Sequence, residues 1–127
     1  MAIILHITTQ AEWDAARAAG SYRPASLAQE GFIHASTPAQ AVATANAHFR
    51  GRRDLILLCI DEDRVAAAIR YEHPAAHDPR AHERFPHIHG PLLPDAVVAI
   101  VAFPYDPALG FQLPAAASRH NLPDIGS

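Results

Sequence analysis

Apolar and polar residues alternate over short stretches of this chain, and the period of each stretch predicts a particular element. Four stretches are rich in β-branched or alternating apolar residues and predict strands: 3–8, 31–36, 55–60 and 96–103. The third is apolar on both faces, which is typical of a central strand. Residues 69–73 also look extended. Residues 85–92, punctuated by prolines, predict a strand edge that runs into a turn.

Two helices are predicted from their boundary signals. Thr9-Gln10-Ala11-Glu12 has the form of a capping box, and the helix that it opens should run to about Ala19 and stop at Gly20. Thr37-Pro38 is a second start signal, for a helix through Phe49. A short turn is expected to end at Glu30, whereas the pattern over 65–68 fits a helix or a strand equally.

The order of these elements indicates the fold class. Strands and helices mix without a regular βαβ rhythm, which favours α+β. With 127 residues, the chain has room for one domain, expected over residues 1–105. Residues 74–83 predict a flexible surface loop, and 106–127 predict a C-terminal tail that could pack on the surface of the domain.

Composition narrows the class of protein further. Half of the residues are hydrophobic, so disorder of the whole chain is excluded, and a net charge of −3 argues against general nucleic-acid binding. The single cysteine, Cys59, lies in the apolar stretch 55–60 and is expected to be a buried, inert thiol. No segment resembles a signal peptide or a membrane helix, so we expect a soluble cytoplasmic protein without membrane partners.

Nine histidines are the unusual feature of the composition. Strand alternation places three of them on polar faces beside another hydrogen-bonding side chain: His6 with Thr8, His34 with Ser36, and His87 with His89. A lone strand histidine is usually structural, but three such pairs favour a shared cleft. The cleft and the structural interpretation both stay open at this point.

These histidine pairs are compatible with more than one kind of functional site. His87-x-His89 projects two rings from one side of a strand, and His6 or His34 would complete a three-histidine metal site. This spacing is weakly specific, and no metal cofactor is expected. The six glycines form neither a phosphate-binding loop nor a dinucleotide fingerprint, which makes P-loop and Rossmann chemistry improbable.

Several motifs resemble one family, the bacterial and plant family of domain of unknown function 952. The resemblance extends over about residues 3–103. It is carried by Leu5-His6-Ile7-Thr8, Trp13, Gly20-x-Tyr22, Ser26-Leu27, Glu30-Gly31-Phe32-Ile33-His34-Ala35-Ser36, Gln40, Ala45-Asn46, Phe49, Leu55-Ile56-Leu57-Leu58-Cys59-Ile60-Asp61, Glu72 and Phe85-Pro86-His87-Ile88-His89-Gly90-Pro91-Leu92. The family commonly has tyrosine where this chain has His89.

This resemblance implies a fold similar to that of ADP-ribosyltransferases, a split, twisted β-sheet flanked by helices that holds NAD in a central cleft. His6, His34 and His87 would then be the catalytic elements of the three core strands. The cofactor, NAD, would contact His6, His34 and their neighbours, and the expected cofactor-binding residues therefore include Thr8, Ser36 and His89.

Transfer from NAD builds positive charge on the ribose, so a nearby carboxylate is expected. Histidine at the third position does not supply one, and Glu72 or Glu30 would have to do so.

Three functions follow from these residues and from the resemblance. The first is an NAD-binding, ADP-ribosyltransferase-like protein in which an imidazole near neutral pKa is the base. The second is a non-catalytic module that binds a nucleotide or small anion with the same histidines and an arginine such as Arg23 or Arg84. The third is a histidine metal site with hydrolytic activity.

Overall fold

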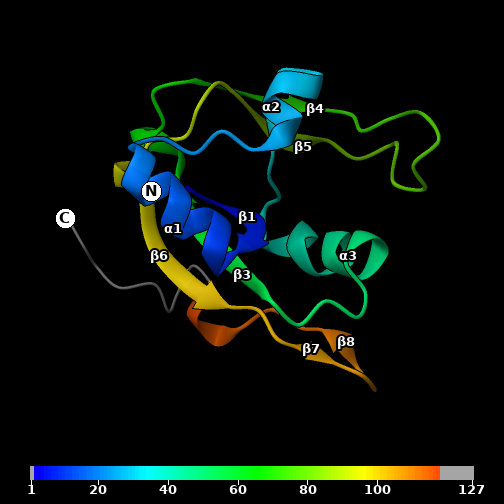
Figure 1. The fold of residues 1–127 in the computed structure, drawn as a ribbon. Coiled ribbons are helices and arrows are strands. Elements are labelled where there is room, and N and C mark those ends of the chain that lie inside the picture. Colours follow the sequence, from blue (N-terminus) through cyan, green and yellow to red (C-terminus); the bar gives the residue numbers. More distant parts are fainter. Residues whose placement is uncertain (1, 118–127) are drawn as a thin grey trace.

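The strands predicted from apolar patterning pair into two antiparallel sheets. The computed structural model describes residues 2–117 of the chain. One sheet has the order β1-β3-β6, formed by β1 (Ile3–Thr9), β3 (Leu55–Asp61) and β6 (Val97–Ala102) (Figure 1). The other has the order β2-β5-β4, formed by β2 (Ile33–His34), β5 (Phe85–His89) and β4 (Ala68–Glu72). The predicted strand 55–60 is confirmed as a central, fully buried strand, with Cys59 completely covered.

Helices connect and cover these sheets. The longer ones are α1 (Gln10–Ala19) and α3 (Pro38–His48), and α2 (Ala25–Glu30) is a short one. Single 3₁₀ turns follow at η1 (Glu62–Arg64), η2 (Pro94–Ala96) and η3 (Ala115–Ala117). The predicted boundaries of α1 are confirmed. Thr9 Oγ1 accepts the Glu12 N–H at 3.1 Å, and Gly20 ends the helix at φ 85°.

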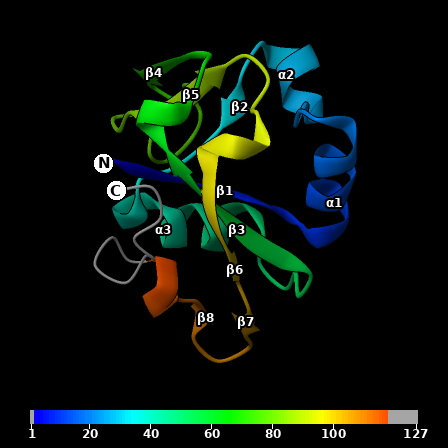
Figure 2. The same ribbon diagram turned by 90° about the vertical axis from the view of Figure 1, so that its left-hand side faces the viewer.

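The two faces of the β1-β3-β6 sheet bury separate apolar clusters. Strand alternation sends Ile4 to one face, where it packs with Trp13 of α1 and Ile88 of β5. It sends Leu5 to the other face, where Ala41 of α3 covers it. Figure 2 shows α1 and α3 on opposite sides of this sheet. The second sheet therefore lies on the α1 side, and His6 faces it.

Within the described residues, an isolated backbone bridge joins β1 to the segment that directly follows β2. Leu5 N donates to Ser36 O at 2.7 Å, and Ser36 N donates to Leu5 O at 2.8 Å. The strand predicted over 31–36 is shorter than expected because the chain leaves the second sheet after His34 and meets β1 two residues later. This crossing holds His34 and Ser36 next to His6.

The prediction for 85–92 is confirmed in part: a strand forms and the chain bends after it at Gly90, but the edge position is wrong. β5 is the central strand of its sheet and pairs with both β2 and β4. Proline has no backbone N–H, and Pro86 is tolerated there because the β2 ladder stops at His34 and requires no donor from it. The Pro86 carbonyl accepts the Ala35 N–H at 3.1 Å.

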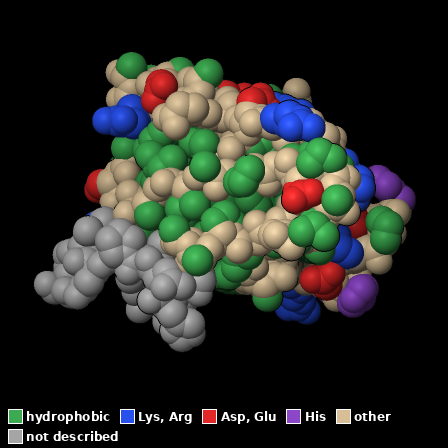
Figure 3. All heavy atoms as spheres, turned by 90° about the horizontal axis from the view of Figure 1, so that it is seen from below, with side chains coloured by type: hydrophobic (Ala, Val, Ile, Leu, Met, Phe, Trp, Pro, Cys, Tyr) green, Lys and Arg blue, Asp and Glu red, His purple; other side chains and the backbone are tan. Residues whose placement is uncertain are grey.

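Part of the predicted tail packs against the body. Strands β7 (Tyr105–Asp106) and β8 (Gly110–Phe111) form a small hairpin. Phe111 is 1% exposed and belongs to the apolar cluster under α3, together with Ala117. On the face seen in Figure 3, apolar side chains gather at the centre, charged side chains lie around them, and the histidine side chains lie towards one end. The remainder of the predicted tail, 118–127, lies outside the described residues.

The α+β class is confirmed, as one small domain with antiparallel sheets and few helices. Within residues 2–117, no helix has the length and apolar character needed to cross a membrane.

Candidate functional site

A cavity of about 420 Å³ opens where the two sheets meet, bounded by α3 and by the loop after β4. Four of the expected site residues line it: His6, His34, Ser36 and His87. The expected cofactor contacts Thr8 and His89 are not among its lining residues; their side chains are bonded to Glu12 and Glu72 respectively. The cleft expected from strand alternation therefore exists, with a smaller set of residues.

His6 is fixed by bonds at both ring nitrogens. Nδ1 donates to the carbonyl of His34 at 2.5 Å, so in the neutral ring Nε2 is the acceptor, and it lies 2.7 Å from the Tyr22 hydroxyl. In the alternative orientation of its one hydrogen, Tyr22 donates to Thr8 Oγ1 at 3.1 Å, and Thr8 in turn donates to Glu12 at 2.6 Å. The expected pair His6 and Thr8 thus belongs to a buried polar chain that reaches the carboxylate of Glu12.

Burial controls the charge of this ring. His6 is 7% exposed, and burial lowers its pKa from 6.5 to about 4. At neutral pH it is therefore an uncharged imidazole that orients its neighbours, and both its nitrogens are already bonded within the protein.

The HxH pair on β5 is held by a single carboxylate oxygen. His87 Nδ1 donates to Glu72 Oε1 at 2.9 Å, and His89 Nε2 donates to the same atom at 2.7 Å. The bonds from His89 and His87 lower the pKa of the Glu72 carboxyl, and burial lowers the pKa of His87. Among residues 2–117, no group of three or more His, Cys, Asp or Glu side chains is arranged to hold a metal ion.

Aromatic and imidazole rings form one wall of the cavity. The rings of Phe32 and His87 stack at 4.0 Å with 13° between their planes, and His34 meets Phe32 edge-on at 4.9 Å. His34 is half-exposed and donates from Nε2 to Glu30 Oε2 at 2.8 Å. Glu30, one of the two carboxylates considered from the sequence, also lines the cavity, whereas Glu72 is not among the lining residues.

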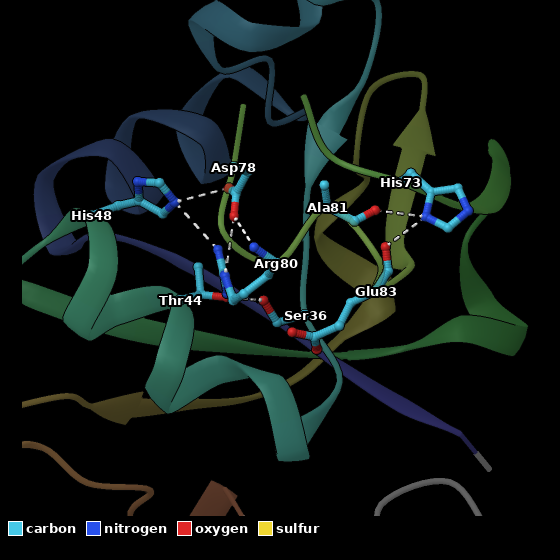
Figure 4. Close-up of polar contacts among 8 residues, drawn as sticks. All are labelled: Ser36, Thr44, His48, His73, Asp78, Arg80, Ala81 and Glu83. Carbon is cyan, nitrogen blue, oxygen red and sulfur yellow. Dashed lines mark hydrogen bonds and ion pairs between the residues drawn. The ribbon is translucent and has the colours of Figure 1, made fainter. Parts of the chain in front are cut away.

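The opposite wall joins α3 to the loop after β4 (Figure 4). Arg80 donates from Nη1 to Thr44 Oγ1 at 2.8 Å and from Nη2 to His48 Nε2 at 3.3 Å. Thr44 Oγ1 lies 3.2 Å from Ser36 Oγ, which links this wall to the first. At the base of the loop, His73 Nδ1 lies 3.0 Å from the carbonyls of both Ala81 and Glu83. The predicted surface loop is therefore anchored at both ends and forms part of the cavity.

The arginine of the cavity differs from the one expected. Arg23 and Arg84 are not among the lining residues, whereas Arg80 is. Arg80 was not expected at the site because 74–83 was predicted to be a surface loop, and Thr44 and His48 of α3 were not expected there either. The four-residue spacing of Thr44 and His48 was an available signal, since it places both on the same side of a helix.

The comparisons with known proteins give a family and a fold. The family model described as "Protein of unknown function (DUF952)" matches residues 7–100. The crystal structure of protein CC0527 from Caulobacter crescentus, a structural-genomics target, is 34% identical to this chain, with a TM-score of 0.74, and the match covers 87% of this chain and 94% of that one. Its solution NMR structure gives a TM-score of 0.72 at the same identity, covering 87% and 91%. No match is found among curated proteins.

Proposed function

This chain belongs to the family of unknown function DUF952, and we propose that it binds a nucleotide in the cavity between its two sheets. NAD is the ligand that the resemblance to ADP-ribosyltransferases implies. The observation that carries this proposal is the convergence of His6, His34, Ser36 and His87, from separate segments, on one cavity of about 420 Å³.

The character of the two walls supports a ligand with a planar base and polar substituents. Aromatic and imidazole rings favour offset or edge contacts with a flat ring, and Phe32 and His34 offer such surfaces, with His87 stacked behind Phe32. Hydroxyl groups of Ser36 and Thr44 line the same space and are suited to ribose or phosphate oxygens. Because His6 is neutral and bonded at both nitrogens, binding is better supported than acid–base catalysis by that ring.

Thermal stability in the presence of ligands tests this function. We expect NAD or ADP-ribose to raise the Tm of the wild-type protein, since a ligand at a hundred times its Kd stabilises the folded state by about 2.7 kcal/mol. His34→Ala should weaken this shift, and His82→Ala, at an exposed position of the loop, should not. No change in Tm with NAD, NADP, ADP-ribose and nicotinamide, each at tens of millimolar, would contradict the proposal that this protein binds a nucleotide.

NAD cleavage is the second candidate, and Glu30 is the observation that favours it. Its carboxylate lines the cavity beside His34, where it is available to stabilise positive charge developing on a ribose. In this reaction the bond between ribose and nicotinamide breaks, nicotinamide leaves with the electron pair, and water or another acceptor adds to the ribose carbon. Release of nicotinamide by the wild type, lost in Glu30→Gln, would support it. NAD binding without release would leave the binding function alone.

A further inference from the structure

Arg80 differs from the other candidate arginines because its guanidinium is held in place at the cavity. Its side chain is 17% exposed, and its Cζ lies 4.8 Å from the centre of the Phe85 ring. Thr44 and His48, one helical turn apart on α3, each accept one of its hydrogens. Holding the side chain in this way reduces the conformational entropy that a ligand would otherwise have to remove.

The guanidinium still has donors to offer. It carries five N–H bonds, of which each terminal nitrogen uses one on α3 and Nε faces Asp78 at 3.5 Å. Among the described residues, one further hydrogen on each terminal nitrogen has no partner, and such a fork is suited to two oxygens of a phosphate group.

Asp78 already provides a negative charge at this position. Its carboxylate is 12% exposed and lies 3.5 Å from Arg80 Nε and 3.7 Å from His48 Nε2. The backbone N–H of Arg80 donates to Asp78 Oδ1 at 2.8 Å and lowers the pKa of that carboxyl, so Asp78 is ionised at neutral pH. Asp78 and an incoming anion therefore compete for the guanidinium of Arg80.

From this geometry we propose that Arg80, held in place by His48 and Thr44, binds a phosphate group of the nucleotide, and that Asp78 is the internal counter-ion with which this phosphate competes. The inference rests on the proposed function and deepens it, because it assigns the phosphate to the α3 side of the cavity and the base to the ring wall. In this proposal one side chain, Arg80, both anchors the loop to α3 and binds the phosphate group.

Calorimetric titrations with ADP-ribose, adenosine and inorganic pyrophosphate test the assignment. Arg80→Gln should weaken ADP-ribose and pyrophosphate binding by roughly tenfold or more, the size expected for a charge-assisted bond, and leave adenosine unchanged. Arg80→Lys keeps the charge without the fork and should be intermediate. Asp78→Asn keeps the oxygen that accepts the Arg80 N–H and removes the competing charge, so ADP-ribose and pyrophosphate should bind more tightly.

Arg84→Gln is the matched control, because Arg84 is an exposed arginine four residues away that does not line the cavity. It should bind all three ligands as the wild type does. Thermal unfolding of each variant without ligand checks that it folds.

The inference and the proposed function fail in different ways. An unchanged ADP-ribose affinity in Arg80→Gln, or equal weakening of ADP-ribose and adenosine in the folded variant, would overturn the phosphate assignment while nucleotide binding stands. Pyrophosphate binding that depends on Arg80, with no binding of ADP-ribose or adenosine, would support the anion site and overturn the nucleotide. Failure of all three ligands to bind the wild type would overturn both.

Discussion

His6 illustrates how much of the site follows from a single residue and its strand. Alternation along 3–8 places it on the face opposite Leu5, and the structure confirms that placement, because His6 bonds Tyr22 of the apolar cluster on the α1 side whereas Leu5 belongs to the cluster on the α3 side. Its partners are less accessible to sequence reasoning. Tyr22 reaches His6 because its backbone pairs with Leu92, at 2.7 Å from N to O, and such a long-range bridge leaves no local periodicity.

The buried imidazole predicts a specific dependence of stability on pH. The folded pKa of His6 is about 4 against 6.5 in the unfolded chain, so between these values only the unfolded state binds the proton. The contribution of His6 to the free energy of unfolding should therefore be fully present above pH 6.5. It should fall by on the order of 3 kcal/mol as the pH drops from 6.5 towards 4.

Urea denaturation across this pH range measures the effect. His6→Gln should flatten the dependence, whereas His82→Gln, an exposed histidine of the loop, should keep the wild-type slope. The same slope in wild type and His6→Gln would show that His6 is not the residue responsible.

Elements of this fold were predictable where a local sequence pattern determines them. They were missed where their position depends on tertiary contacts. The capping box at Thr9 and the doubly apolar stretch 55–60 carry their own signals, and both elements form as expected. The central position of β5 was missed because proline in a strand normally indicates an edge. The loop 74–83 was placed in solvent because nothing in its local sequence indicates that Arg80 reaches α3.

The C-terminal hairpin is the element whose contribution to stability is most easily tested. Phe111 N donates to Asn46 Oδ1 of α3 at 2.9 Å, and its ring packs 4.9 Å from that of Phe103. Phe111→Ala should therefore lower the free energy of unfolding by about 3–5 kcal/mol, as expected for a buried phenylalanine.

Leu109→Ala is the matched control for this hairpin. Leu109 is 64% exposed, so the change should stay within about 0.5 kcal/mol in chemical denaturation. A Phe111→Ala variant as stable as Leu109→Ala would mean that the Phe111 ring adds nothing to the stability of the folded domain.

At the scale of the whole molecule, the cavity is a consequence of having two sheets instead of one. The bridge between Leu5 and Ser36 brings β1 and β2 together at one point and leaves space on the α3 side. The histidine wall was predictable from strand alternation and family motifs. The arginine wall was not, because it depends on how α3 and the loop after β4 meet.

The central claim is that this cavity binds a nucleotide with the base on the ring wall and the phosphate beside α3. An NMR titration of ¹⁵N-labelled protein with ADP-ribose tests it most directly, because each backbone amide reports its own surroundings. We expect saturable shifts at His34 and Ser36 on one wall and at Thr44, His48 and Arg80 on the other, with the Arg80 side-chain signals among the largest. Shifts confined to the β7–β8 hairpin, or no saturable shifts at any residue lining the cavity, would contradict the account.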